Sequence, residues 1–254
     1  MAVDPFQALQ AAHRGPVSSH AAGESTGTLL ICGATGALGQ ELVRRLAGRH
    51  RFDHTRVLAR EPIRDGLRSV ETVLVPNAPL AEWPPVRADT ALVLFEPPRL
   101  YYDRERALWT PEPAQLPALA RWLRASGVHT LAVVQPHAQG RLPEALKRGL
   151  ASLDEQAVAA QGFDRVILVR SAQKPAQVRF IHPAERLANW MLSITRFMVP
   201  TSEQPVRASK VAELVDVALR IAPPGVHVAA PELVWQAAQA DVRAVAEGWL
   251  FGRP

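Results

Sequence analysis

The sequence predicts a doubly wound α/β protein, in which a parallel sheet carries helices on both faces. Short apolar runs alternate with segments of helical periodicity between residues 28 and 170. Three glycines follow the first apolar run, at the point where the helical spacing begins. The chain has 254 residues, which is enough for one sizeable α/β domain with a full core. We therefore expect one sheet-based domain with a mainly helical C-terminal part.

The elements follow from hydrophobic periodicity. Buried strands are expected at the apolar runs of residues 28–32, 55–59, 71–75, 91–95, 130–134 and 166–169, with a short strand at 226–228. Amphipathic spacing predicts helices around residues 42–46 and over residues 113–124, 143–161, 182–197, 211–221 and 231–249. A long loop, residues 96–102, lies just past a strand end, where such folds bind their ligands. Residues 1–27 show no sustained period and are expected to form a flexible leader, so that one domain spans residues 28–254.

Composition and charge narrow the possible functions. The formal net charge is +5, and the basic residues are scattered, so nucleic-acid binding is weakly supported. No apolar run approaches the roughly 20 residues of a membrane span, so no membrane partner is expected. The single cysteine, Cys32, excludes an internal disulfide and fits the cytoplasm. It lies in the first expected strand, where a small buried side chain is the simplest interpretation. Hydrolase motifs and Cys/His metal spacings are lacking, so we expect no metal site.

The glycines form a G-x-x-G-x-x-G turn between the first strand and the first helix. Gly33 would permit the tight turn, and Gly36 would let the backbone approach a pyrophosphate. Gly39 would let the helix pack closely against the strand. The free N–H groups and the positive dipole end of that helix would attract an anion. The alternative is a glycine-rich turn that binds nothing, but strand, glycines and helix in register favour a dinucleotide site.

The same residues carry a family resemblance. The run Gly33-Ala34-Thr35-Gly36-Ala37-Leu38-Gly39 resembles the G-A-T-G-x-x-G turn of the atypical, extended-type short-chain dehydrogenase/reductases. Within that superfamily it is most similar to the NmrA-like NAD(P)-binding proteins. The resemblance covers about residues 28–230 and implies a Rossmann fold with the cofactor across the carboxyl ends of the strands. It also implies that residues 172–254 form a small substrate-side lobe of the same domain.

The resemblance and the expected fold together give a set of cofactor-binding residues. These come from the glycine turn and from the ends of the second, fourth and fifth strands: Gly33, Thr35, Gly36, Ala37, Leu38, Gly39, Arg60, Phe95, Glu96 and Gln135. Arg60 stands where an arginine accommodates the 2′-phosphate of NADP, whereas Glu61 could instead bind the ribose hydroxyl of NAD. An arginine of no special role is also possible, because this chain uses arginine freely. NADP(H) is therefore favoured, and NAD(H) stays possible.

The catalytic pattern of the resembling reductases is not present. They use a tyrosine acid, a lysine four residues later and a serine after the fifth strand, but this chain has no Y-x-x-x-K. Counting along the resembling stretch places Lys147 at the tyrosine position and Gln135 or Pro136 at the serine position. Lys147 and His137 are the candidates to act in place of these groups, although both could simply be solvated residues near a cleft. The loop tyrosines, Tyr101 and Tyr102, could stack on a ligand or serve packing alone.

Two functions from different classes follow. The first is an NADP(H)-binding protein that performs a nonstandard oxidoreductase step on a small organic substrate. The second is a non-enzymatic sensor, which binds the dinucleotide and passes its occupancy to a protein partner. The missing tyrosine, lysine and serine favour the second, while the glycine turn is common to both. A third hypothesis, an arginine-rich nucleic-acid binder, would require strongly salt-dependent affinity.

Overall fold

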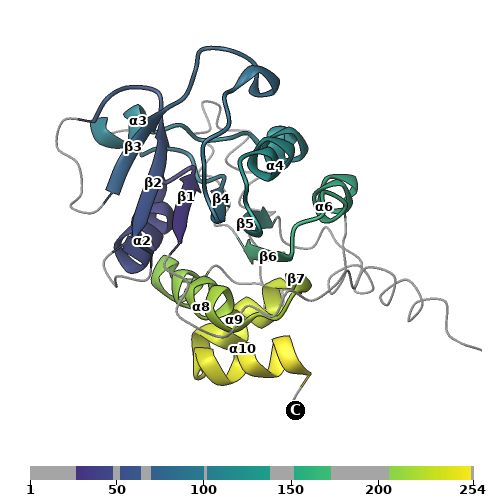
Figure 1. Ribbon diagram of the computed structural model, residues 1–254. Helices are drawn as coiled ribbons and strands as arrows, with labels where there is room; N and C mark the ends of the chain where they lie inside the picture. Colours follow the sequence, from purple (N-terminus) through teal and green to yellow (C-terminus); the bar gives the residue numbers. More distant parts are fainter. Residues whose placement is uncertain are drawn as a thin grey trace, which may run out of the picture.

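A computed structural model describes residues 27–47, 52–63, 70–99, 102–137, 152–172 and 206–252. At its centre is a seven-stranded sheet whose strands pair in the order β3-β2-β1-β4-β5-β6-β7. All neighbouring strands are parallel (Figure 1). The strands are β1 (Thr28–Cys32), β2 (His54–Ala59), β3 (Val70–Leu74), β4 (Thr90–Leu94), β5 (Thr130–His137), β6 (Arg165–Ala172) and β7 (Gly225–Ala229).

Helices cover both faces of this sheet. On one face lie α2 (Gly36–Ala47), α8 (Ala208–Ile221), α9 (Pro231–Gln239) and α10 (Val242–Phe251). On the other lie α4 (Leu116–Ala125) and α6 (Leu153–Ala159), together with the short 3-10 turns η1 (Leu80–Glu82) and η2 (Pro113–Gln115) (Figure 1). The five-residue α3 (Asp103–Ala107) follows the loop after β4. The strand order and the two helical layers confirm the doubly wound fold expected from the sequence.

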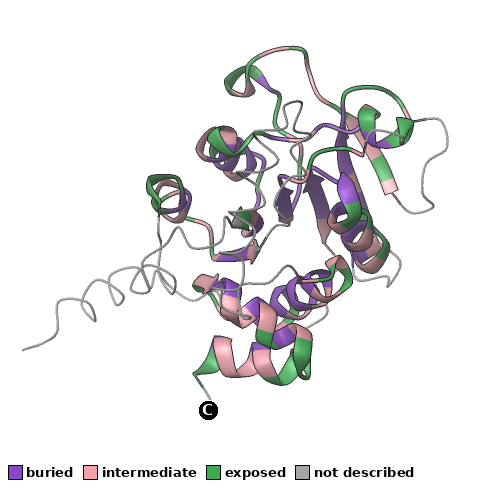
Figure 2. Ribbon diagram, turned by 180° about the vertical axis from the view of Figure 1, so that it is seen from behind, coloured by how far each residue is buried: buried purple, intermediate pink, exposed green. Residues whose placement is uncertain are grey.

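The central strands explain the two layers. In β1, Leu29 and Ile31 belong to the core under α2 and α8, while Leu30 and Cys32 belong to the core under α4. All four are fully buried, because side chains alternate between the faces of a strand that is covered on both sides (Figure 2). Burial also raises the pKa of the Cys32 thiol, so that this cysteine is a neutral core residue.

The C-terminal helices differ from the sequence expectation in one respect. The predicted single helix over residues 231–249 is wrong, because the chain forms α9 and α10 with a break at Ala240 and Asp241. The Asp241 side chain accepts hydrogen bonds from the amides of Arg243 and Ala244, at 2.7 and 3.1 Å, and so starts a new helix. Both helices and α8 contribute to the same core as α2.

Several other expectations can be compared with the structure. β1 has the predicted bounds, the bounds of the other strands differ by at most three residues, and helix 113–124 is split into η2 and α4. The part of the predicted helix 143–161 that the structure describes contains α6. The leader up to residue 26 and the predicted helix 182–197 lie outside the described residues, and the substrate-side lobe stays a prediction. Within the described ranges, every helix is too short or too polar to cross a bilayer.

Candidate functional site

The glycine turn lies where the strand order changes direction. β1 pairs with β2 on one side and with β4 on the other, so the chain leaves β1 toward β2 and later crosses back to β4. In open α/β sheets this point opens a crevice at the carboxyl ends of the strands, where ligands bind. The structure therefore places Gly33–Gly39 at the position in the fold where a ligand is expected.

Two of the three glycines are required by the packing of the chain itself. Gly33 has φ +83°, and a Cβ there would lie 2.1 Å from the carbonyl oxygen of Leu94. The Gly33 amide donates a hydrogen bond to the Trp109 carbonyl at 3.1 Å. A Cβ on Gly39 would lie 2.5 Å from the carbonyl carbon of Ala34, so α2 packs directly on the turn. These contacts agree with the predicted roles of the two glycines: Gly33 permits the tight turn, and Gly39 lets the helix pack closely.

The amides at the start of α2 are bound to two carboxylates of the same chain. The Gly36 amide donates to Oε2 of Glu105 at 3.0 Å, and the Leu38 amide donates to Oε2 of Glu96 at 2.8 Å. α2 has no acidic residue in its own first turn. Both carboxylates come from the segment that follows β4, and they complement the positive end of the helix dipole.

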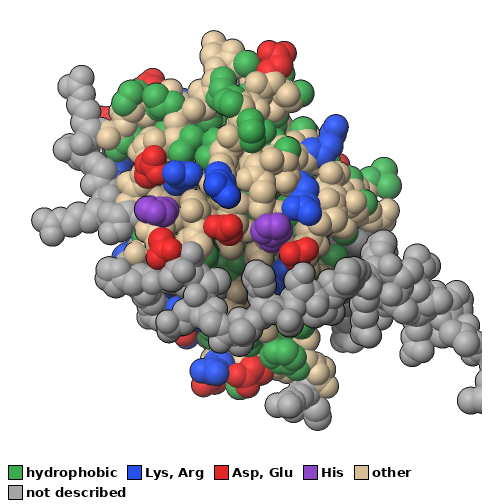
Figure 3. Space-filling view, in the orientation of Figure 1, with side chains coloured by type: hydrophobic (Ala, Val, Ile, Leu, Met, Phe, Trp, Pro, Cys, Tyr) green, Lys and Arg blue, Asp and Glu red, His purple; other side chains and the backbone are tan. Residues whose placement is uncertain are grey.

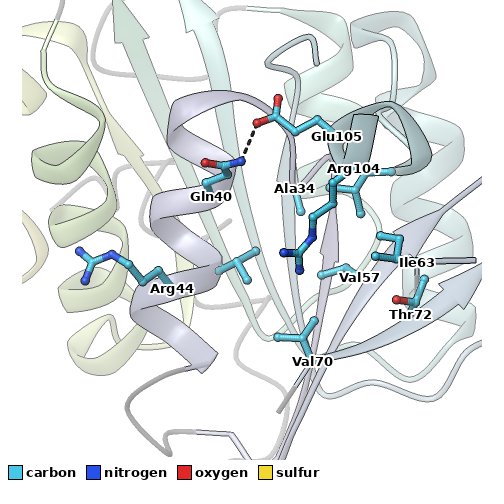
Figure 4. Close-up of a pocket in the computed structure, with 11 residues that line it drawn as sticks. Ala34, Gln40, Arg44, Val57, Ile63, Val70, Thr72, Arg104 and Glu105 are labelled. Atoms are coloured by element: carbon cyan, nitrogen blue, oxygen red, sulfur yellow. Dashed lines mark hydrogen bonds between the residues drawn. The ribbon is translucent and has the colours of Figure 1, made fainter. Parts of the chain in front are cut away.

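Glu105 is the more firmly held of the two. Its side chain is 1% exposed, and its carboxylate accepts from Gln40 Nε2 at 2.7 Å (Figure 4). Arg99 donates to it from its backbone amide and from its guanidinium, at 2.8, 2.8 and 2.5 Å. Burial raises the pKa of Glu105, but the hydrogen bonds from Arg99 and Gly36 outweigh it, so the pKa lies below its usual range. Glu105 is therefore an ionised, fixed part of the turn.

Thr35 joins the turn to the segment after β4. It is buried, its hydroxyl donates to the backbone carbonyl of Glu96, and it shares a hydrogen bond of 3.0 Å with the Thr110 hydroxyl. Phe95, the residue after β4, is buried in the core under α4 rather than open to the crevice. The structure thus brings Thr35 and Glu96 together with the glycines, and places the Phe95 side chain behind them.

The remaining predicted cofactor residues lie in α2, near the end of β5 and just past β2. Ala37 is exposed at the start of α2, and Leu38 is half-buried against the core. Gln135 lies half-buried near the end of β5, two strands from β1. Arg60 is exposed just past β2, and its backbone amide donates to the Ala107 carbonyl at 2.7 Å. Among the residues that the structure describes, none forms a hydrogen bond or ion pair with the Arg60 guanidinium.

A cavity of about 280 Å³ opens beside the turn, on the side of α2 that faces β2 and β3. Its walls are mainly apolar, and its lining includes Ala34, Gln40, Val43, Arg44, Val57, Ile63, Val70, Thr72, Arg104, Glu105 and Leu108. Figure 4 shows the Arg104 side chain reaching from α3 over this cavity, whereas Arg44 points away from it. No described residue pairs with the Arg104 guanidinium. The cavity therefore combines apolar walls with an available positive charge.

The sequence did not identify Glu105, Arg99 or Arg104 as site residues. Glu105 lies in the charged run Asp103–Arg106, which is typical of a solvated surface, and its partner amide is 69 positions away. The tyrosine candidates can be compared only in part. Tyr102 is 49% exposed, and its ring lies under the Arg99 guanidinium at 3.8 Å, while Tyr101 lies outside the described residues.

A buried ion pair joins β6 to α6, near the region predicted to be catalytic. Arg170 donates from Nε and Nη2 to the Glu155 carboxylate of α6, at 3.0 and 2.6 Å, and both side chains are 3% exposed. His137 is the last residue of β5, but its side chain, like the whole of Lys147, falls outside the described part. Their proposed catalytic roles stay predictions. Across the described ranges, no cluster of three metal-ligating side chains is found.

Charge on the surface is mixed. On the face shown in Figure 3, Lys and Arg side chains lie among Asp and Glu side chains rather than in a patch of one sign. Oppositely charged neighbours among the described residues include Arg44 with Glu41 and Arg243 with Glu247, whose charged atoms lie 2.6 and 2.9 Å apart. Exposed pairs of this kind are worth little to stability, and they give no extended positive surface.

No protein-family model matches this sequence, and no curated protein matches it either. Solved structures with a similar fold include a nucleoside-diphosphate-sugar epimerase from Staphylococcus aureus, 14% identical, with a TM-score of 0.46 over 80% of this chain and 71% of that chain. The Bordetella bronchiseptica enzyme WbmF, in complex with NADH, is 12% identical, with a TM-score of 0.46 over 89% of this chain and 77% of that one. MoeE5, in complex with UDP-glucuronic acid and NAD, is 16% identical, with a TM-score of 0.46 over 80% and 75% of the two chains.

Proposed function

We propose that this protein binds a nicotinamide dinucleotide at the turn between β1 and α2, with NADP(H) preferred over NAD(H). The observation that carries the proposal is the glycine turn at the switch point between β1 and β4, followed directly by a helix of 12 residues. In this position a pyrophosphate is bound by helix amides and by the helix dipole. The backbone of the turn fits such a group.

The side chains at the turn fit a bound pyrophosphate less well than the backbone does. Glu96 and Glu105 already accept the amides of Leu38 and Gly36, and both carboxylates carry the same sign of charge as a pyrophosphate. Binding thus requires that at least one carboxylate leaves the turn. When bound, a nicotinamide dinucleotide supplies hydride transfer. The residues of this chain would bind and orient it, and we assign no catalytic step to them.

The position of the cavity beside α2 indicates how the dinucleotide would be oriented. In the Rossmann design the ribose of the adenosine half lies next to the end of the second strand. The cavity lies on the β2 side of the turn and is lined by Arg104, while Arg60 directly follows β2; neither guanidinium has a partner among the described residues. We propose that the adenosine half lies on this side and that its 2′-phosphate binds an arginine there.

The sensor function is the second candidate. General acid catalysis supplies about 10²–10⁴-fold in rate, and the tyrosine and lysine that provide it in the resembling reductases are missing here. The experiment combines calorimetric titration of NADP⁺ and NAD⁺ with stopped-flow NADPH oxidation over aldehydes and quinones. An oxidoreductase turns over at least one substrate, and a sensor binds without turnover. A folded protein that binds neither dinucleotide would contradict both candidates.

Arg60→Ala is expected to lower the affinity for NADP⁺ by about 10- to 100-fold and to leave the affinity for NAD⁺ nearly unchanged. The reason is the loss of a charge-assisted hydrogen bond to the 2′-phosphate, worth about 1.5–3 kcal/mol. Calorimetry of the parent and the variant with both dinucleotides measures this. Arg121→Ala, on the exposed side of α4, removes the same charge far from the turn and serves as the control. Equal loss for the two dinucleotides would contradict the assignment of Arg60.

A further inference from the structure

The start of α2 is already bound by an anion that belongs to the chain. We propose that Glu96 is an intramolecular competitor of the dinucleotide, which occupies the pyrophosphate position and must be displaced before the cofactor binds. This inference rests on the proposed function, and it adds a means by which the chain limits its own affinity. It makes Glu96 a residue that determines affinity without contacting the bound cofactor.

The first argument is steric. A Cβ placed on Gly36 would lie 2.2 Å from Cδ, 2.4 Å from Cγ and 2.5 Å from Oε2 of Glu96. The Glu96 carboxylate therefore fills the space that the missing side chain of Gly36 leaves open. In a dinucleotide site this is the space through which the backbone approaches the pyrophosphate. Carboxylate and pyrophosphate cannot occupy it together.

The second argument is electrostatic. The positive end of a helix dipole stabilises a nearby negative charge, and the Leu38 amide at this end donates to Glu96 at 2.8 Å. A phosphate oxygen would use the same amide and the same dipole. With Glu96 in place, an incoming pyrophosphate would lose that donor and would also lie against a like charge. Competition for the Leu38 amide and short-range repulsion by Glu96 both lower the affinity for the dinucleotide.

The third argument separates Glu96 from Glu105. Glu105 is almost fully buried and is held by Gln40 and Arg99 as well as by Gly36, so its removal would break the junction between α2 and α3. Glu96 is half-buried, the Leu38 amide is the one described hydrogen-bond donor to its carboxylate, and the Arg99 guanidinium attracts it without a described hydrogen bond. Glu96 can therefore turn toward solvent at the cost of one hydrogen bond and of a weak attraction to Arg99. Glu105 stays and keeps the Gly36 amide bound.

The test is a calorimetric titration of NADPH into the 254-residue protein. Glu96→Ala is expected to bind NADPH about 10- to 100-fold more tightly than the parent, because a charge-assisted hydrogen bond no longer has to be broken. Glu96→Gln keeps the shape without the charge and should lie between the two. Glu82→Ala, in the exposed turn η1 on the other face of the sheet, removes the same charge and should bind like the parent.

A thermal melt of each variant without ligand separates competition from a merely structural role. Glu96→Ala loses a contact to α2, so its Tm should fall slightly while its affinity for NADPH rises. Equal or weaker binding of NADPH by Glu96→Ala, with the parent binding firmly, would overturn the inference and leave the proposed function in place. If neither the parent nor Glu96→Ala binds NADPH although both are folded, the proposed function fails and the inference fails with it.

Discussion

The Gly33→Ala variant is expected to lose about 4 kcal/mol or more of its free energy of unfolding, a loss large enough to prevent folding in many proteins of this size. A Cβ at this position would lie 2.1 Å from the Leu94 carbonyl oxygen, which is part of the neighbouring strand and cannot move aside alone. The positive φ of +83° adds its own strain. Urea unfolding, followed by tryptophan fluorescence, measures the loss.

Gly162→Ala is the matched control for this substitution. Gly162 has a similar φ of +75°, but no atom lies within 4 Å of the position of an added Cβ. Its cost should be limited to the backbone strain of about 1–2 kcal/mol. The difference between the two variants then isolates the close approach of the turn to β4. Similar losses for both would mean that the packing around Gly33 is looser than the contact with Leu94 indicates.

The Arg170→Met variant should lose about 3–5 kcal/mol of stability. It removes one member of an ion pair whose two side chains are each 3% exposed, and so leaves the Glu155 carboxylate buried without its guanidinium. Equilibrium unfolding in urea, followed by circular dichroism, measures the change.

The double variant Glu155→Leu/Arg170→Met provides the sharper comparison. With both charges replaced by apolar groups, part of the stability should return, since the desolvation cost of the pair disappears with its attraction. Arg243→Met, which breaks the exposed pair with Glu247, should cost less than about 0.5 kcal/mol. A double variant as unstable as Arg170→Met alone would show that the two side chains stabilise the fold by more than neutralising each other's charge.

Most of the fold could be predicted because its signal is local. The strands of a doubly wound sheet are covered on both faces, so they read as nearly continuous apolar runs, and β1, β4 and β5 begin within one residue of their predicted positions. The break between α9 and α10 was missed because Ala240 and Asp241 are compatible with a continuous amphipathic helix. The cap formed by the Asp241 side chain is what ends the continuous helix and starts α10.

The site was harder to predict because its contacts are not local. The glycine turn has a recognisable spacing, and it lies between the first strand and the first helix of the sheet, as predicted. The carboxylates that bind its amides are 58 and 69 positions away, and no periodicity indicates that an acid from a charged run becomes buried. Helix α3, which carries Glu105, has only five residues and lacks a hydrophobic face that would predict it.

The long-range contacts of α2 have a consequence for the motions of the native state. The amide protons of Gly36 and Leu38 are protected from exchange by side chains of the segment after β4, whereas the Gly39 amide is protected by the nearby Thr35 carbonyl. Exchange at Leu38 therefore requires that the Glu96 side chain turns away, and exchange at Gly36 requires that Glu105 leaves its buried position, in both cases without the melting of α2. The difference in exchange rate between Leu38 and Gly39 would report the free energy of this local opening. Hydrogen exchange at two neighbouring amides thus becomes a measure of how strongly distant parts of the chain are joined.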